Sequence, residues 1–268
     1  MNIDISQSES EEIFSDILFD FVEIRKPSAS TNAKGIILGG QPGSGKSFLK
    51  DEVRSEFTED FIFISTDDLR LYHPAYLELQ QNPETVQNAA NLVNPYASAW
   101  TEKLIKYCIE NKYNLIIDST LGGNIKAVFD TIDMFRNKGF KVHLRVMAVP
   151  AIISRLSIFL RYETQLVEKG FARWTRIEDH DDRFNNLKTN LIEIKNNKKP
   201  DSIKFYERVL GKSGTIQLKC LEGFEIKNLG NIEVNSDNLY FVNQMAEKVR
   251  NLIQNRSGRS IDFEKITI

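Results

Sequence analysis

A glycine-rich stretch has the composition of a loop that binds phosphate, and it consists of Gly40, Gln41, Pro42, Gly43, Ser44, Gly45, Lys46 and Ser47. These residues match the pattern G-x-x-x-x-G-K-[ST] in full. The glycines let the backbone curl until consecutive N–H groups face phosphate oxygens. The Lys46 ammonium then reaches the terminal phosphates, and the Ser47 hydroxyl is a ligand for Mg²⁺. We therefore predict that this loop binds a nucleoside triphosphate together with Mg²⁺.

Short apolar runs that alternate with helix-like stretches must position this loop, and they cover residues 35–40, 61–66, 114–120 and 142–149. Such runs are typical of buried parallel strands. The loop follows the first run and precedes a helical stretch, as the motif requires. We predict an α/β protein with the P-loop NTPase or kinase fold, a mostly parallel sheet flanked by helices. After about residue 200, two strands around a Gly-Lys-Ser-Gly turn predict a hairpin at an edge.

Carboxylates follow two of these runs, at the edge of a parallel sheet where ligands bind. Asp67 follows the second run and Asp118 ends the third. A carboxylate beside the loop can accept the proton of an attacking hydroxyl, as a kinase requires, or can hold Mg²⁺ through water. The alternative is a helix N-cap, which Thr66 or Asp68 supplies equally well beside Asp67.

The first thirty residues differ from the α/β pattern. Ser8 and Glu11 fit a capping box, an apolar stripe follows at helical spacing, and Pro27 ends the pattern. We divide the chain into a helical extension, residues 1–30, and a P-loop domain, residues 31–268. The apolar stripe packs on its own domain, or it regulates the protein or binds a partner.

The composition excludes several classes of protein. A net charge of −2, from interleaved acids and bases in 268 residues, gives no field that would attract nucleic acid. The acidic start is unlike a signal peptide, and no apolar run reaches the roughly 20 residues of a membrane span. Two cysteines, Cys108 and Cys220, suit a reducing compartment. We expect a cytoplasmic protein without nucleic-acid or membrane partners.

The chain resembles the zeta toxins, P-loop kinases of bacterial toxin–antitoxin systems, from about residue 34 to residue 206. The resemblance rests on the order of GGQPGSGKS, STDDLRLYHPAY, NPYASAWTEKLI, YNLIIDSTL, VMAVP, RYET and FARWTRIEDHD. It implies transfer of the ATP γ-phosphate to the 3′-hydroxyl of the amino sugar of UDP-N-acetylglucosamine, which inhibits cell-wall synthesis. Asp67 is then the general base, and Arg161 and Arg173 contact the phosphoryl group, with Arg176 as a competitor. The resemblance assigns the sugar-nucleotide pocket to Glu102, Asp118 and Thr120.

One segment departs from the family pattern. Family members commonly have Glu-Gly-Thr-x-Arg at the end of the third strand, where this chain has Asp-Ser-Thr-Leu-Gly from Asp118 to Gly122. The carboxylate is shorter and the arginine is missing, although Lys126 or Arg70 can compensate. Two alternatives therefore stay open. One is a P-loop kinase of another nucleotide or small metabolite, and the other is an ATP-binding switch without transferase activity.

The resemblance also bears on the N-terminal helix, because a separate helical antitoxin blocks the nucleotide site of zeta toxins. Residues 1–26 carry acidic side chains opposite or flanking the apolar stripe. We hypothesise that this segment is a tethered inhibitor that competes with ATP phosphates for Lys46 and the nearby arginines. Tethering raises an effective concentration to the millimolar range, so weak docking would suffice.

Overall fold

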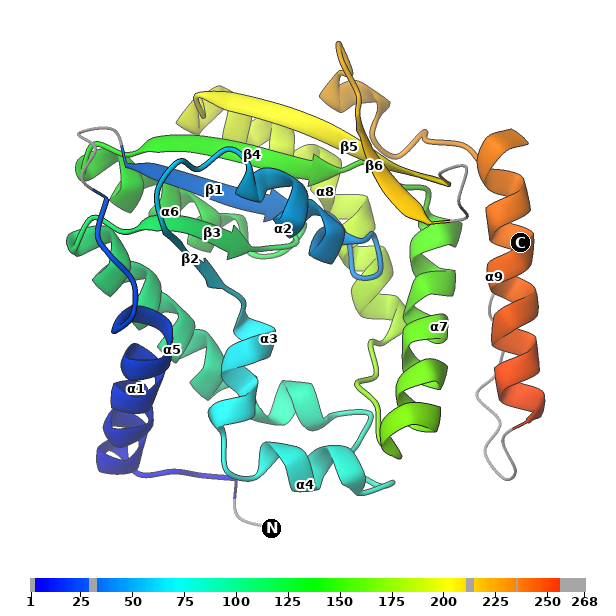
Figure 1. Cartoon of the computed structure of the whole chain (residues 1–268), viewed down its shortest axis with the longest axis horizontal. Helices are drawn as coiled ribbons and strands as arrows, with labels where there is room; N and C mark the ends of the chain where they lie inside the picture. The colour runs from blue at the N-terminus through cyan, green and yellow to red at the C-terminus, as the bar shows by residue number, and fades with distance from the viewer. Residues whose placement is uncertain (1–2, 29–32, 211–214, 235, 256–268) are drawn as a thin grey trace.

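The structure is a computed structural model that describes residues 3–28, 33–210, 215–234 and 236–255. Its centre is a six-stranded sheet in the order β2-β3-β1-β4-β5-β6 (Figure 1). Neighbouring strands are parallel except for β5 and β6, which form an antiparallel hairpin at one edge. The strands are β1 (Lys34–Gly39), β2 (Phe61–Ile64), β3 (Asn114–Asp118), β4 (Lys141–Met147), β5 (Ser202–Leu210) and β6 (Ile216–Cys220). The predicted α/β fold and the antiparallel pair of strands at the edge are confirmed, and the predicted Gly-Lys-Ser-Gly turn between them lies outside the described residues.

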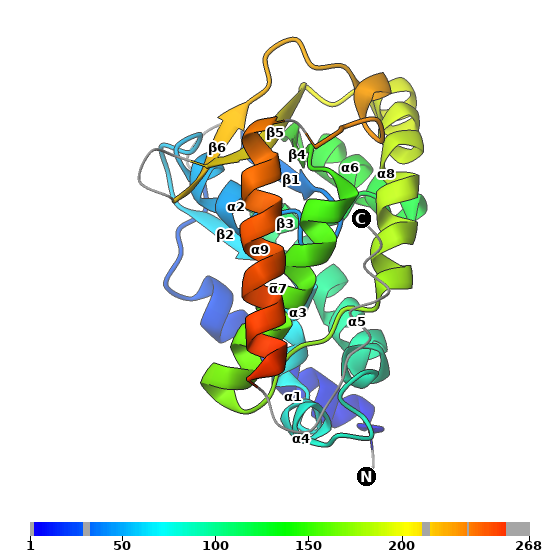
Figure 2. The same ribbon diagram turned by 90° about the vertical axis from the view of Figure 1, so that its right-hand side faces the viewer.

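Helices cover both faces of this sheet (Figures 1 and 2). The longer ones are α1 (Gln7–Val22), α2 (Lys46–Arg54), α5 (Ala89–Glu110), α6 (Ile125–Asn137), α7 (Ala151–Lys169), α8 (Ile177–Lys198) and α9 (Ser236–Gln254). Shorter helical segments are α3 (Thr66–Leu69), η1 (Arg70–Tyr72), α4 (Tyr76–Gln81) and η2 (Ile226–Asn228). None of the described helices is both long and apolar enough to cross a membrane.

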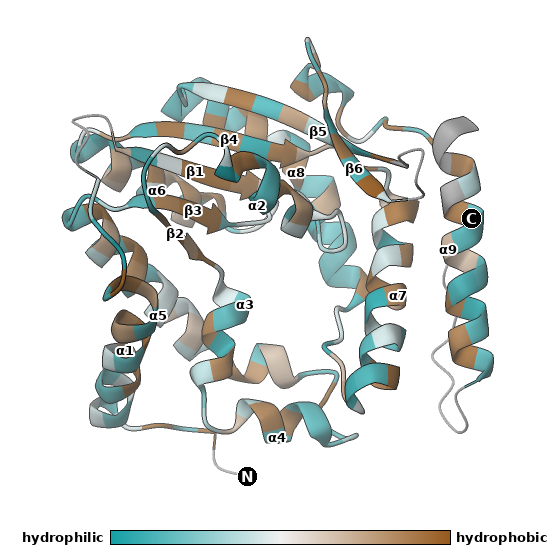
Figure 3. Cartoon of the chain, in the orientation of Figure 1, coloured by the Kyte–Doolittle hydropathy of each residue, from teal (hydrophilic) through white to brown (hydrophobic). Residues whose placement is uncertain are grey.

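The alternation of side chains along β1 divides the core into two layers. Ile36 and Leu38 belong to a buried cluster with residues of α2, α7 and α9. Ile37 belongs to a second cluster with residues of α1, α5, α6 and α8. Successive residues of a strand face opposite sides of a sheet, so a strand buried on both sides must be apolar throughout. This requirement explains the apolar runs at residues 36–38 of β1 and 115–117 of β3, and Figure 3 shows apolar residues along both strands.

The N-terminal helix α1 packs beside α5 (Figure 1). Ser6 is its N-cap and accepts a hydrogen bond from the Glu9 amide at 3.2 Å, so the helix begins earlier than the predicted capping box. The Ser10 hydroxyl accepts a hydrogen bond of 2.9 Å from the indole of Trp100. Ile17 and Val22 are buried in the core cluster that α5 also joins. The alternative in which the apolar stripe packs on its own domain is the one observed.

We expect the Ile17→Ala variant to lower the free energy of unfolding by about 2–5 kcal/mol, because Ile17 is 0 % exposed and its truncation leaves a cavity. Phe19→Ala on the same helix is the control and should change stability little, since Phe19 is 65 % exposed. Urea denaturation of both variants measures the difference. Equal stabilities would contradict the packing of α1 described above.

Candidate nucleotide-binding and phosphoryl-transfer site

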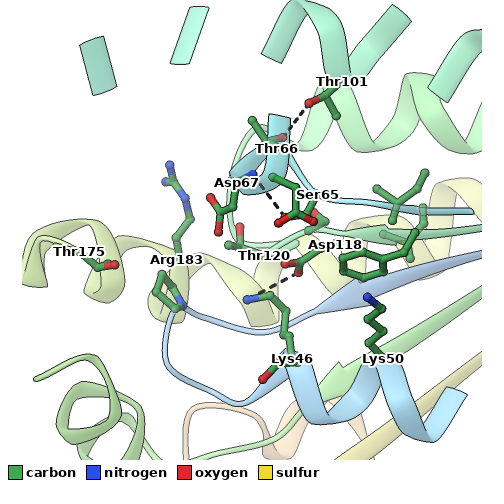
Figure 4. A pocket seen from close by; sticks show the side chains of 18 of the residues that line it. Lys46, Lys50, Ser65, Thr66, Asp67, Thr101, Asp118, Thr120, Thr175 and Arg183 are labelled. Carbon is green, nitrogen blue, oxygen red and sulfur yellow. Dashed lines mark hydrogen bonds and ion pairs between the residues drawn. The ribbon is translucent and has the colours of Figure 1, made fainter. Parts of the chain in front are cut away.

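A cavity of about 920 Å³ lies at the carboxyl ends of β1, β2 and β3. The glycine-rich loop, α3, α5, α7 and α8 contribute residues to its wall (Figure 4). Ligands of parallel α/β proteins bind at this edge of the sheet. The strand-end residues singled out in the sequence therefore meet in one place.

The loop between β1 and α2 has the backbone of a phosphate-binding loop. Gly40, Gly43 and Gly45 have φ angles of 136°, 76° and 98°, which L side chains rarely adopt. Gly43 also lacks room for a side chain, since a Cβ there would lie 2.1 Å from the Ser154 carbonyl oxygen. The α2 helix starts at Lys46, so its free N–H groups and positive dipole end point toward the loop. This geometry suits the oxygens of a di- or triphosphate.

Lys46 is placed to contact a phosphate bound in the loop. Its Nζ donates a hydrogen bond of 3.0 Å to the Gly40 carbonyl oxygen and lies 3.9 Å from Oδ1 of Asp118 (Figure 4). Gly40 belongs to the loop and Asp118 ends β3, so these contacts hold Lys46 between the loop and the strand end. Lys46 also lines the cavity. A phosphate in the loop would therefore meet the ammonium group directly.

Three predicted ATP-binding residues, Gly40, Gln41 and Ser44, do not line the cavity. The side chains of Gln41 and Ser44 are buried. Gln41 donates hydrogen bonds from Nε2 to the Val149 carbonyl oxygen, at 2.9 Å, and to the Ser154 hydroxyl, at 3.1 Å. The Gln41 side chain thus fastens the loop to the start of α7.

A buried polar network continues from this anchor. Ser154 Oγ lies 2.8 Å from Nε2 of His180, and Nδ1 of His180 lies 2.7 Å from Oδ1 of Asp181. Ser154 and His180 are both 0 % exposed, and burial lowers the pKa of His180 despite the neighbouring carboxylate. A serine nucleophile needs access to its substrate. We therefore assign this Ser-His-Asp arrangement to holding the loop in place, because its reactive atoms are inaccessible.

Asp67 lies at the start of α3, directly after β2, and its carboxylate lines the cavity. The cap of α3 is the Ser65 hydroxyl, which accepts from the Asp67 amide at 3.3 Å, so the Asp67 carboxylate is not needed as a cap. Arg70 Nη1 contacts its Oδ1 at 2.5 Å, and Arg173 contacts its Oδ2. Burial raises the pKa of Asp67, but Arg173 and Arg70 outweigh it and hold the pKa below its ordinary value. The carboxylate is therefore ionised at neutral pH.

Arg161 and Arg173 both line the cavity, whereas Arg176 pairs with Glu178 and Asp179 on its own helix. Burial, together with Arg173, lowers the pKa of Arg161 to about 10, so the guanidinium stays charged at neutral pH. The Nε atoms of Arg161 and Arg173 are buried and have no hydrogen-bond partner within the described part of the chain. Buried donors without acceptors are costly. An anion bound between these arginines would satisfy them.

The residues around Asp118 fit a Mg²⁺ ion held jointly with phosphates. Burial raises the pKa of Asp118, and its Oδ1 atom has no hydrogen-bond partner among the described residues. Ser47 lines the same cavity. Mg²⁺ is usually held by one or two protein oxygens, substrate phosphates and waters. When bound, the ion would offset the charge that develops on the phosphates.

The other predicted substrate residues, Glu102 and Thr120, also line the cavity. Lys126, suggested as compensation for the missing strand-end arginine, does not line it, whereas Arg70 does. Arg183 of α8 was not predicted, and Figure 4 shows its side chain among those around the cavity. The α8 backbone comes close here, because a Cβ on Gly122 would lie 2.0 Å from the Arg183 carbonyl oxygen. Gly122, which follows the end of β3, is the local sequence feature that could have indicated this close approach of α8.

Comparisons with known proteins agree with this geometry. The family profile described as zeta toxin matches residues 22–216. The chain belongs to the zeta toxin family. A zeta toxin from Enterococcus hirae is 34 % identical over 195 residues, which make up 72 % of this chain and 66 % of that protein. The aligned region thus spans slightly under two thirds of that family member.

Solved structures support the fold of the zeta toxin family for nearly the whole chain. One comes from the PezAT chromosomal toxin–antitoxin system of Streptococcus pneumoniae. It has a TM-score of 0.77 at 23 % identity and covers 95 % of this chain and 100 % of its own. Another, an AvrRxo1-ORF1:-ORF2 complex with ATP, has a TM-score of 0.59 at 13 % identity over 94 % of this chain and 86 % of its own.

The N-terminal helix does not lie at the nucleotide-binding cavity, where a tethered inhibitor would have to bind. No residue of α1 is among the described residues that line the cavity. Two of its acidic side chains have other partners, since Glu11 pairs with Lys103 at 2.6 Å and Asp20 accepts a hydrogen bond from Tyr72 at 2.6 Å. In this arrangement α1 does not contact Lys46, and inhibition by residues 1–26 stays a prediction that would require α1 to leave α5.

Proposed function

We propose that the protein is an ATP-dependent kinase. It would transfer the γ-phosphate to the 3′-hydroxyl of the amino sugar of UDP-N-acetylglucosamine and so inhibit cell-wall synthesis. The observation that carries the proposal is that Asp67 shares one cavity with the loop lysine, Lys46, and with Arg161 and Arg173. A carboxylate, a phosphate loop and two cations that face one space are what transfer to an alcohol requires. Membership of the zeta toxin family supports the choice of reaction.

In the proposed reaction the acceptor oxygen attacks the γ-phosphorus, its bond to the phosphorus forms, and the bond to the β,γ-bridging oxygen breaks. Asp67 accepts the hydroxyl proton, and ADP leaves with the bridging oxygen. The transition state is loose, so most of the catalysis is positioning and charge stabilisation. Lys46, Arg161 and Arg173 supply that charge. Such an arginine can be worth roughly 10³–10⁵ in rate.

The ion pair between Asp67 and Arg173 describes the site before nucleotide binds. In the free protein Arg173 and Arg70 occupy the Asp67 carboxylate. A γ-phosphate beside Lys46 would compete for Arg173 and leave one Asp67 oxygen for the acceptor. Charge-assisted bonds to phosphate are strong enough for this exchange. The site therefore assembles fully only when nucleotide is present.

Glu102, Asp118 and Thr120 would contact the acceptor on the side of the cavity formed by α5 and the end of β3. The Asp118 to Gly122 segment favours one alternative, a kinase for another nucleotide or small metabolite. Arg70 and Arg183 supply cations on the cavity wall, so the acceptor in either case is expected to be anionic.

We also propose that a separate antitoxin, rather than α1, silences this kinase. The related PezAT protein is described as part of a toxin–antitoxin system. The packing of α1 against α5 supports a structural role for residues 1–30 beside the kinase domain of residues 31–268. If α1 were inhibitory in cis, the Ile17→Ala variant would show higher turnover than the wild type.

The test is incubation of the purified protein with γ-labelled ATP, Mg²⁺ and a panel of acceptors that includes UDP-N-acetylglucosamine. Label on the 3′-oxygen of the amino sugar is the expected result. Label on a different acceptor would favour the alternative kinase. Label only in free phosphate would overturn the transferase proposal and leave a nucleotide switch. Thin-layer separation followed by mass spectrometry distinguishes the three products.

A further inference from the structure

The segment that joins β3 to α6, residues 119–124, is fixed against α8. Asn190 of α8 is buried, and its Nδ2 donates hydrogen bonds to the carbonyl oxygens of Leu121, at 2.9 Å, and Gly123, at 3.0 Å. Leu121 has a φ of 54°, which is uncommon for a residue other than glycine and persists only where the surroundings hold it. The segment therefore has one defined position at the edge of the cavity.

The same segment connects α8 to the phosphate loop through Thr120, which lines the cavity. The Thr120 carbonyl oxygen accepts a hydrogen bond of 3.1 Å from the Gly40 amide. Figure 4 shows the Arg183 side chain beside Thr120. A Cβ on Gly123 would lie 3.6 Å from Nε of Arg183 and 3.6 Å from the Thr120 hydroxyl oxygen. The guanidinium and the hydroxyl thus border one spot on the cavity wall.

Arg183 differs from the other described cations on this wall. Its side chain is half-buried, and no hydrogen bond or ion pair joins it to the described part of the chain. Each of the others contacts a protein group: Arg70 and Arg173 the Asp67 carboxylate, Arg161 the Thr175 hydroxyl, Arg208 the Ser157 hydroxyl, Lys46 the Asp118 carboxylate and Lys50 the Phe63 ring. The donors of the Arg183 guanidinium are therefore available to a ligand.

Arg70, the other cation considered for the acceptor, is engaged within the protein. Its Nη1 contacts Asp67 at 2.5 Å, and its Nη2 donates a hydrogen bond of 2.8 Å to Oδ1 of Asn94. An acceptor anion could bind Arg70 only in competition with these groups. Arg183 has no such competitor among the described residues, so it is the better partner for an anion on the acceptor side of the cavity.

We propose that Arg183 binds a phosphate group of the acceptor and so makes the enzyme select a phosphate-bearing alcohol. This inference rests on the proposed function, since it concerns the acceptor of the same transfer. Arginine pairs with phosphate through two parallel N–H···O bonds. Because residues 119–124 join α8 to the phosphate loop, that phosphate is held at a fixed distance from the triphosphate. The acceptor hydroxyl is then positioned beside Asp67.

Arg183→Gln and Lys188→Gln form a matched pair for the test. Both residues are half-buried cations of α8, and only Arg183 is part of the cavity wall. We expect Arg183→Gln to raise the KM for UDP-N-acetylglucosamine about tenfold or more, the effect of losing a charge-assisted hydrogen bond. The kcat and the KM for ATP should stay within about threefold of the wild type, because only acceptor binding is lost. Lys188→Gln should change none of the three constants. Steady-state kinetics with γ-labelled ATP and Mg²⁺ measures them.

Free N-acetylglucosamine, which has the sugar hydroxyl but no phosphate, is the second acceptor. Its kcat/KM with the wild type should be lower than that of UDP-N-acetylglucosamine by about tenfold or more. Equal values for the two acceptors, or an unchanged KM for UDP-N-acetylglucosamine in Arg183→Gln, would overturn the inference and leave the proposed function intact. An equal rise in both KM values of Arg183→Gln would also overturn it, since the role of Arg183 would then be structural. A wild type that labels neither acceptor would overturn the proposed function and this inference together.

Discussion

Replacing Lys46 by alanine should reduce phosphoryl transfer by about 10³-fold or more, the range found when a cation or donor at a developing phosphoryl charge is removed. The lysine Nζ lies at the mouth of the loop, where its contacts are the Gly40 carbonyl oxygen and Asp118. Alanine is a strong helix former at the start of α2, so the fold should persist. Steady-state kinetics with γ-labelled ATP measures the loss, and circular dichroism checks the fold.

Lys50→Ala is the matched control for that experiment. Lys50 lies one turn further along α2, lines the same cavity and stacks on Phe63, with Nζ 4.0 Å from the ring centroid. Both substitutions remove one positive charge from one helix. We expect Lys50→Ala to lose less than tenfold. If Lys50→Ala loses as much activity as Lys46→Ala, the loss comes from the reduced positive charge of the cavity. A specific contact between Lys46 and phosphate would then not explain it.

Asp67→Asn should preserve ATP binding and lower turnover by about 10²–10⁴-fold, the usual contribution of a positioned general base. Asparagine keeps the shape of the side chain but accepts a proton poorly. It also releases Arg173 from its ion pair, so the apparent affinity for ATP should be unchanged or tighter. A fall in kcat without a rise in the KM for ATP is therefore the expected signature. A fully active variant would refute the general-base assignment.

The neighbouring Asp68 supplies the control for this second variant. It lines the same cavity, but burial and then the Asp67 charge raise its pKa, so it is the poorer candidate for an ionised base. Asp68→Asn should lose less than tenfold. The pH profile gives a further check, because the pKa of Asp67 lies below its ordinary value. The kcat/KM of the wild type, which reports the free protein, should therefore fall with decreasing pH only below the usual range of an aspartate.

The phosphate loop and the sheet could be predicted because their signals are local. The φ angles of Gly40, Gly43 and Gly45 favour glycine, and the sequence has glycine at these three positions of the loop. Strands buried on both sides need unbroken apolar runs, as at Ile36 to Leu38. Parallel strands also place their carboxyl ends at one edge, which put Asp67 and Asp118 beside the loop.

The partners of these residues could not be predicted, because they come from distant parts of the chain. Asp67 and Arg173 are 106 positions apart, and Gln41 and Ser154 are 113 apart. His180 lies between charged residues in the sequence, yet it is fully buried. A partly buried arginine such as Arg208 and an exposed one such as Arg176 each have an acidic residue and an aliphatic residue within two positions in the sequence. Only the packing of α7, α8 and β5 around the loop distinguishes them.

The sequence by itself determined the backbone of the loop, the order of strands and helices, and the family, because each depends on residue types at short spacing. Tertiary structure decided that α1 packs on α5 and not over Lys46, and that Arg70, Arg183 and Arg208 join the site. The physical reason is that an amphipathic helix or a long cationic side chain only requires a partner surface. Which surface it meets depends on how the whole chain packs.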